Sequence, residues 1–263
     1  MVNPAVFRRS IRMIACLAAV AGLASPLGFS QEPPDLKPPQ YRGVTAVVDG
    51  IFVTPVPGAP LTAVVEVESR QTLADGSTLA RKSIANIARD SQGRIYNERR
   101  QLVSPPFSGQ PPLLSFHIFD PETRFSIFVN PATKIARQST LPAPAPAADS
   151  NPDPLYSAGK PPVDGEDLGT QVMENVVAHG VRKTTTVPAT ASGTGKPVIV
   201  TDEYWYSDEL HLNMLVKHDD PRSGQQTVSV TRLVRTEPDE SRFKVPPGYK
   251  LVDETPETPN RQN

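Results

Sequence analysis

Apolar and polar residues alternate along most of this chain with the period of two that is typical of β-strands. Short turn sequences rich in Gly, Asp, Asn and Pro separate the alternating segments, and Asp75-Gly76 is the strongest hairpin signal among them. The pattern predicts six strands in the first half and five in the second. These are Ala63–Leu73, Thr78–Arg89, Arg94–Val103, Leu113–Phe119, Arg124–Val129 and Lys134–Ser139, followed by Thr170–Met173, Val176–Val187, Pro197–Tyr206, His211–Lys217 and Gln226–Arg235.

Two of these segments are expected to be interior strands. Leu113–Phe119 is apolar on both faces, as a central strand would be, and Pro197–Tyr206 ends in three consecutive aromatic residues. No segment carries a helical apolar stripe of more than two turns, and only Glu237–Arg242, with its Pro238, is expected to form a helical turn. The side chains expected to be buried in the two interior strands are Leu114, Phe116, Ile118, Val198 and Val200.

The first thirty residues have the pattern of an export signal. Three arginines precede the apolar segment Met13–Ala24, which has a length typical of secretion and is short for a membrane span. Gly28 and Ser30 fit the small-residue rule for cleavage after residue 30. The Arg8-Arg9 pair leaves the twin-arginine route open beside ordinary secretion. We therefore expect a periplasmic or secreted protein with no transmembrane segment once the signal is removed.

Proline-rich segments divide the remaining chain. The chain has 30 prolines in 263 residues, about twice the average usage. Residues 31–42 are expected to be a linker, and residues 141–165 an exposed Pro-rich insert, because neither has an apolar face. The predicted organisation is one β domain over residues 43–250 that contains this insert, followed by a disordered tail at 251–263.

Composition and charge narrow the classes of function. Removing residues 1–30 takes away the only cysteine and three arginines, which leaves 24 basic and 28 acidic side chains and a net charge of −4. This balance, without a basic stripe, argues against a nucleic-acid partner. A chain without cysteine in an oxidising compartment depends on its core alone for stability.

Side chains with catalytic or metal-binding spacing are scarce. The four histidines form no His-Glu-x-x-His or His-x-His pattern. The group His218-Asp219-Asp220, with Asp202 and Glu203 on a neighbouring predicted strand, could hold a cation weakly, and a solvated polar turn is the alternative. No Gly-x-Ser-x-Gly elbow occurs. The sequence therefore predicts no catalytic residue, no cofactor and no metal site.

The second half resembles a known fold family. A strand ending at Pro188, the segment Asp202–Leu210 around Trp205, a returning amphipathic strand and Phe243-x-Val245-Pro246 are similar to the periplasmic lipoprotein-carrier half barrel of LolA, LolB and the RseB-type sensor domain. The resemblance covers about residues 168–250. It implies a curved antiparallel sheet with an apolar concave face that holds acyl chains.

The expected fold is thus mainly β, a curved, half-barrel-like antiparallel sheet with little helix besides the signal segment. The expected function is a non-catalytic binding or sensing protein for a lipid, a lipoprotein or another apolar ligand. Two alternatives stay open: an interaction module of the cell envelope that binds another envelope protein, and a hydrolase. Trp205 and Met214 are the candidate ligand-binding residues, with plain core packing as the alternative for Trp205.

Overall fold

The computed structural model describes residues 51–73, 75–143 and 160–256, all within one unit that extends from Gly43 to Asn263. The expected signal segment, the linker and most of the Pro-rich insert lie outside the described residues. Within the described residues, no helix is long and apolar enough to cross a membrane.

Residues 61–140 form an antiparallel meander in which each strand pairs with the next. The turns between its strands fall at the expected Gly, Asp, Asn and Pro positions. The strands are β1 (Leu61–Thr72), β2 (Thr78–Arg89), β3 (Ile95–Arg100), β4 (Leu113–Phe119), β5 (Phe125–Asn130) and β6 (Ile135–Thr140).

The later part of the chain forms a second meander, followed by a short 3-10 helix and a last strand. The elements are β7 (Glu166–Met173), β8 (Val176–Val187), the short helix α2 (Ala189–Ser192), β9 (Val198–Ser207), β10 (Leu212–Asp220), β11 (Gly224–Val234), the 3-10 helix η2 (Glu240–Phe243) and β12 (Lys250–Asp253).

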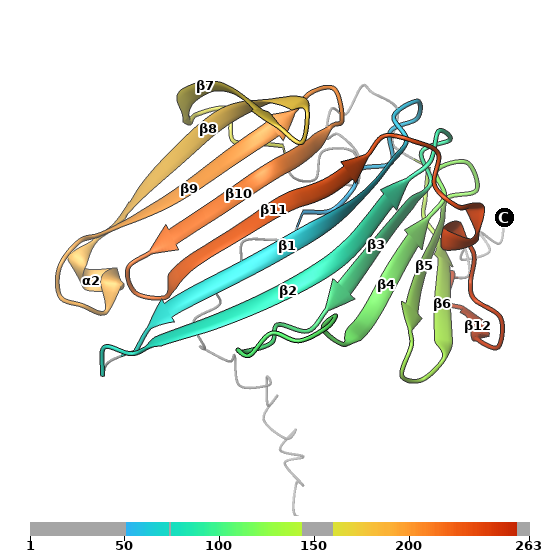
Figure 1. Ribbon diagram of the computed structural model, residues 1–263, viewed down its shortest axis with the longest axis horizontal. Helices are drawn as coiled ribbons and strands as arrows, with labels where there is room; N and C mark the ends of the chain where they lie inside the picture. The colour runs from blue at the N-terminus through green and yellow to red at the C-terminus, as the bar shows by residue number, and fades with distance from the viewer. Residues whose placement is uncertain (1–50, 74, 144–159, 257–263) are drawn as a thin grey trace, which may run out of the picture. The chain divides into compact units, whose positions relative to one another are not determined.

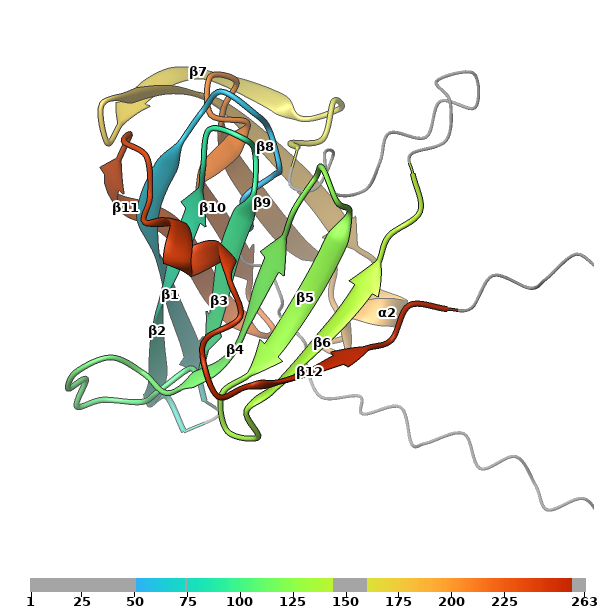
Figure 2. The ribbon, with the colours of Figure 1, turned by 90° about the vertical axis from the view of Figure 1, so that its right-hand side faces the viewer.

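Both meanders belong to one sheet of twelve strands, in the order β12-β6-β5-β4-β3-β2-β1-β11-β10-β9-β8-β7. The first strand of one meander pairs with the last strand of the other, since β1 lies antiparallel to β11. Every pair is antiparallel except β12 with β6, which is parallel. Figures 1 and 2 show that the sheet curves along its strand order and does not close into a barrel. The expected curved antiparallel sheet is confirmed.

The main core covers the face of the sheet that we call the inner face, which carries Val65, Ile87 and Val228. These positions follow from the register, which places Val65 opposite Val230 and Val67 opposite Val228. Each fully buried aliphatic side chain of this size stabilises the fold by about 1.5–3 kcal/mol. The segment before β1 adds to this core: Ile51 and Val53 are buried, and the Val53 backbone N–H donates to Asn97 Oδ1 of β3 at 3.0 Å.

A second core lies on the opposite face of β2 to β6, which we call the outer face. Phe116 and Ile118 of β4 pack there with Phe243 of η2. Figure 2 shows η2 lying in front of the first meander. Asp239 caps η2 by accepting from Ser241 N at 2.8 Å, and the Arg94 guanidinium lies 5.2 Å from the centre of the Phe243 ring. The helical turn expected at residues 237–242 therefore forms at Glu240–Phe243 and closes this outer core.

The structure corrects two details of the expected core and tail. Phe116, Ile118 and Val200 are buried as expected, and Val198 is only half-buried. Leu114 is 45% exposed, because β4 carries a bulge at this point: Ser115 pairs with Arg99 and Leu113 pairs with Arg100. The extra residue breaks the alternation, so Leu113 packs on the outer core in place of Leu114. Residues 251–253, expected in the tail, belong to β12.

Candidate functional site

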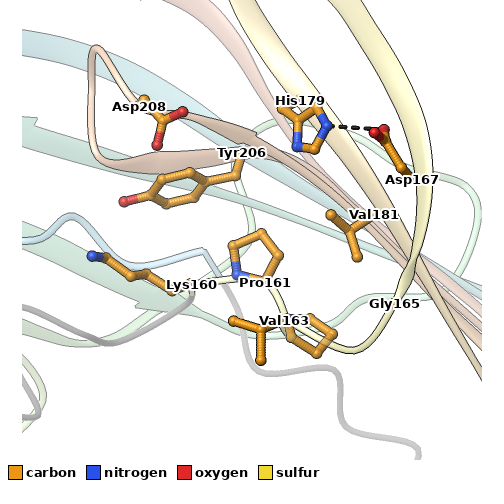
Figure 3. A pocket seen from close by; sticks show the side chains of 10 residues that line it. Lys160, Pro161, Val163, Gly165, Asp167, His179, Val181, Tyr206 and Asp208 are labelled. Carbon is orange, nitrogen blue, oxygen red and sulfur yellow. Dashed lines mark hydrogen bonds and ion pairs between the residues drawn. The ribbon is translucent and has the colours of Figure 1, made fainter.

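A pocket of about 420 Å³ lies on the inner face of the second meander (Figure 3). One side of it is formed by β8 and by the end of β9, and the other side by residues 160–165, which precede β7. About half of the lining residues are apolar or aromatic, and four are ionisable. The lining residues are Lys160, Pro161, Pro162, Val163, Gly165, Asp167, His179, Val181, Tyr206 and Asp208.

The register of β8 and β9 determines which side chains enter the pocket. His179 is the cross-strand partner of Tyr206, and Val181 is the partner of Tyr204. Residues in a strand alternate between the two faces, so His179, Val181 and Tyr206 share the inner face. Trp205, paired with Gly180, points to the other face. The pocket therefore uses a tyrosine of the aromatic triplet rather than its tryptophan.

Residues 160–165 form a strap over this part of the sheet, and Gly165 brings the strap close. A Cβ at Gly165 would lie 2.2 Å from Val181 Cγ1 and 2.9 Å from the Arg182 carbonyl oxygen. The strap therefore contacts β8 at a distance that only glycine permits. Lys183 Nζ lies 3.3 Å from Asp164 Oδ2, an exposed ion pair that contributes at most about 1 kcal/mol.

One end of the pocket holds a paired acid and histidine. His179 Nε2 lies 2.9 Å from Asp167 Oδ1, and the same oxygen accepts from Gly169 N at 2.6 Å. The backbone donor and then the histidine lower the pKa of Asp167. Both hydrogen bonds to the Asp167 carboxylate come from the chain itself, so the polar groups at this end of the pocket already have partners within the protein.

The other end of the pocket holds Tyr206, which is 7% exposed. Burial and then the nearby Asp208 carboxylate raise the pKa of Tyr206, so the phenol is neutral over the physiological range. Its hydroxyl makes no hydrogen bond to any other described residue. Covering such a hydroxyl without giving it a partner costs about 1–3 kcal/mol. Tyr206 therefore offers a donor and an acceptor to whatever fills the pocket.

Close to Tyr206 lies Arg89 of β2, a fully buried cation. Its guanidinium donates to three backbone carbonyls, those of Ala59 at 2.8 Å, Thr54 at 3.0 Å and Leu210 at 2.9 Å. Burial lowers the pKa of Arg89 to about 10, which leaves it charged at neutral pH. Arg89 thus joins the segment before β1 to the β9–β10 loop close to Tyr206.

A separate histidine lies on the inner face of the first meander. His117 stacks on Phe128 with ring centres 4.3 Å apart, and its Nε2 is 2.9 Å from Ser126 Oγ. Burial lowers the pKa of His117 to about 4, so the imidazole is neutral at physiological pH. His117 is not a lining residue of the pocket.

The two residues expected to bind a ligand lie outside the pocket lining. Met214 is 1% exposed within the main core, and Trp205 lies half-buried on the other face of β9, where it packs against part of the same hydrophobic cluster. The Trp205 Nε1–H donates to Glu203 Oε1 at 2.7 Å. Sequence reasoning missed Tyr206 and the strap. The alternation through Tyr204, Trp205 and Tyr206 could have indicated Tyr206, because it places the tryptophan and the two tyrosines on opposite faces. Direct ligand contact by Trp205 and Met214 stays a prediction.

Three of the four acidic residues considered for a weak cation site are held by basic groups of the chain itself, and Asp219 accepts from the Gln225 side chain. Asp202 Oδ1 lies 2.6 Å from His218 Nδ1, and Asp220 Oδ2 lies 2.6 Å from Arg222. Glu203 contacts Lys217 at 2.9 Å. Over residues 51–73, 75–143 and 160–256, no group of three or more His, Cys, Asp or Glu side chains is arranged to hold a metal ion.

Comparison with known proteins gives structural neighbours only. No protein-family model and no curated protein sequence matches the chain. An uncharacterised conserved protein of Thermus thermophilus is similar at a TM-score of 0.39 and 12% identity, over 74% of this chain and 91% of that one. A chain of the Pseudomonas aeruginosa MucA/MucB complex is similar at a TM-score of 0.37 and 12% identity, over 73% of this chain and 58% of that one. This chain thus covers little more than half of the latter.

The LolA superfamily, which the sequence pattern resembles, is among the neighbours. A member from Nitrosomonas europaea is similar at a TM-score of 0.30 and 9% identity, over 73% of this chain and 92% of that one. Such values identify no family, so the function of this chain has to be inferred from its own residues.

Proposed function

We propose that this protein is an exported, non-catalytic binding or sensing protein whose half-barrel sheet holds a lipid, the lipid part of a lipoprotein or another apolar ligand. The observation that carries the proposal is the pocket of about 420 Å³ under the strap. Its volume falls within the range of small-ligand sites, about 300–1,000 Å³. Pro161, Pro162, Val163 and Val181 form an apolar part of its wall, which favours an apolar portion of the occupant.

The surrounding fold supports a binding role. Most of the inner face is filled by the chain's own side chains, including Ile51 and Val53, which makes the sheet a rigid support. The strap is short and contacts β8 closely at Gly165, so it covers the pocket from one side. A pre-formed cavity on a rigid sheet lowers the entropic cost of holding a ligand.

The test is a titration of the protein with a fluorescent long-chain fatty acid while the emission of Trp205 is followed. Trp205 is the only tryptophan of the chain, and its ring contacts Gly180, next to His179 of the pocket. We expect saturable binding at micromolar concentration with a matched change in Trp205 emission. No binding at high micromolar ligand would refute the proposal.

Two matched variants locate the site. Val181→Asn introduces a polar group into the pocket and should weaken binding by about tenfold, the effect of roughly 1.4 kcal/mol. Ile199→Asn makes the same kind of change at an exposed residue of β9 whose position in the strand puts it on the other face, and it should leave binding unchanged. Equal effects of both variants would place the fatty acid elsewhere on the sheet.

A second candidate function, an interaction module for another envelope protein, is favoured by two features of β7 and β8. Val172 of β7 and Val177 of β8 are cross-strand partners, and they are 66% and 59% exposed. β7 is also an edge strand of the sheet, so its outer backbone groups are available for pairing. Native mass spectrometry of the protein taken from its own envelope separates the two functions. A lipid adduct supports the binding protein, and a protein adduct that Val172→Glu abolishes supports the module.

A further inference from the structure

The polar groups at the two ends of the pocket differ in whether the protein itself satisfies them. At the His179 end, the Asp167 carboxylate is held by His179 and by the Gly169 backbone. At the Tyr206 end, the phenol hydroxyl makes no hydrogen bond to another described residue, although Tyr206 is more than nine-tenths buried. A ligand that covered this hydroxyl without bonding to it would leave a buried donor without a partner, which is costly. The Tyr206 end therefore favours a polar group that comes from outside the chain.

Two opposite charges flank this hydroxyl. Figure 3 shows Lys160 on one side of the Tyr206 hydroxyl and Asp208 on the other. Both are exposed, and neither forms an ion pair with another of the described residues. Elsewhere around the strap the charges are paired, as Lys183 is with Asp164. The Tyr206 end therefore presents a cation, a carboxylate and a hydroxyl that other described residues do not engage.

The buried guanidinium of Arg89 does not change the balance of charge around the Tyr206 hydroxyl. Arg89 directs its guanidinium to three backbone carbonyls and not into the pocket. Its positive charge and the negative charge of Asp208 act on Tyr206 with opposite sign. A ligand with only an anionic head would meet the repulsion of Asp208, and one with only a cationic head would meet that of Lys160.

We infer that Lys160, Tyr206 and Asp208 form a head-group subsite that selects an amphiphile whose head carries both an anionic oxygen and a primary ammonium, as an ethanolamine phospholipid does. This inference rests on the proposed function, because it assumes that the pocket holds an amphiphile. The phosphate oxygen accepts from the Tyr206 hydroxyl and from Lys160 Nζ, and the ammonium donates to Asp208. The acyl chain lies against Pro161, Val163 and Val181.

The experiment compares three probes with the same acyl chain, used below their micelle concentration with the full protein: lysophosphatidylethanolamine, lysophosphatidylglycerol and monoacylglycerol. Trp205 emission and calorimetry report the affinity. We expect the ethanolamine lipid to bind most tightly. Tyr206→Phe should weaken both phosphate lipids by about tenfold, the effect of one hydrogen bond to a charged group. Lys160→Met should weaken both by about threefold, as for an exposed charge pair.

The Asp208→Asn variant is the decisive one. It should weaken the ethanolamine lipid by about threefold and leave the glycerol lipid unchanged or tighter, because it removes the ammonium partner and a repulsive charge. Neither charge variant, Lys160→Met or Asp208→Asn, should alter monoacylglycerol binding by more than the control Lys196→Met, whose residue is exposed and lies outside the pocket lining. Circular dichroism confirms that each variant is folded.

The outcomes separate this inference from the proposed function. If the three probes bind with equal affinity and no variant changes these affinities, the head-group subsite is refuted and the apolar binding function stands. If Asp208→Asn weakens both phosphate lipids alike, the assignment of the ammonium to Asp208 is wrong. If no probe binds to the wild-type protein, the proposed function itself fails.

Discussion

The contact between Gly180 and Trp205 allows a sharp test of the β8–β9 packing. A Cβ at Gly180 would lie 2.8 Å from Trp205 Cη2 and Cζ3 and 2.9 Å from Leu168 Cβ. Gly180→Ala therefore forces a rigid indole ring to move, and the ring is held by the hydrogen bond from Nε1 to Glu203. Overpacking of this kind costs about 1–3 kcal/mol. Alanine also restricts the backbone of the unfolded chain, which offsets about 0.4–1 kcal/mol of this cost.

The expected net effect is a loss of about 1–2 kcal/mol of unfolding free energy. Urea unfolding followed by circular dichroism measures the loss, and Trp205 emission should shift because the ring becomes more exposed. The double variant Gly180→Ala with Trp205→Phe supplies the control. A smaller ring relieves the clash, so the two changes together should cost clearly less than the sum of the single changes. Additive costs, or a Gly180→Ala protein with unchanged stability and emission, would contradict this interpretation of the contact.

The two cores and the strap support three more predictions. Phe116→Ala should cost about 3–5 kcal/mol of unfolding free energy, whereas Leu114→Ala, at the bulge, should cost less than about 1 kcal/mol; equal losses in urea unfolding would contradict the bulge. His117 has a folded-state pKa of about 4, below its usual 6.5, so the unfolded chain binds the extra proton: stability should be full above pH 6.5 and fall towards pH 4 by at most about 1.4 kcal/mol per pH unit. His117→Gln should remove that part of the pH dependence, and an unchanged profile would show that another group is responsible. Gly165→Ala should displace the strap and weaken fatty-acid binding in the Trp205 titration while the circular dichroism spectrum stays the same; unchanged affinity would show that the strap does not shape the site.

Much of the fold could be predicted from the sequence, because the bounds of its strands depend on local alternation and turn residues. β2, β4 and β8 have the bounds that alternation and turn residues indicated. The pairing of β1 with β11 joins segments from the two ends of the domain, and no local pattern specifies it. The parallel pairing of β12 with β6 was missed for the same reason, since Lys250–Asp253 is short and polar.

The candidate site was harder to predict, because its geometry depends on which face a strand presents. The sequence showed three adjacent aromatic residues, and period two separates Trp205 from Tyr204 and Tyr206. Only the pairing of β9 with β8 and β10 shows which face is the inner one. The strap was assigned to the Pro-rich insert because it lacks periodicity, and its contact at Gly165 depends on tertiary structure. The bulge at Leu114 likewise depends on the register with β3.

The central pairing of β1 with β11 has a consequence for how the chain reaches this fold. Each meander consists of neighbouring strands, which can pair quickly because little chain entropy is lost in bringing them together. The seam between the meanders needs Val65 to meet Val230, so it can form only after nearly the whole domain is available. During synthesis, β1 and β11 would each be an unpaired edge until the other arrives, and an unpaired edge is prone to join another chain. Charged residues on β1, such as Glu66, Glu68 and Arg70, disfavour such wrong pairings during that interval.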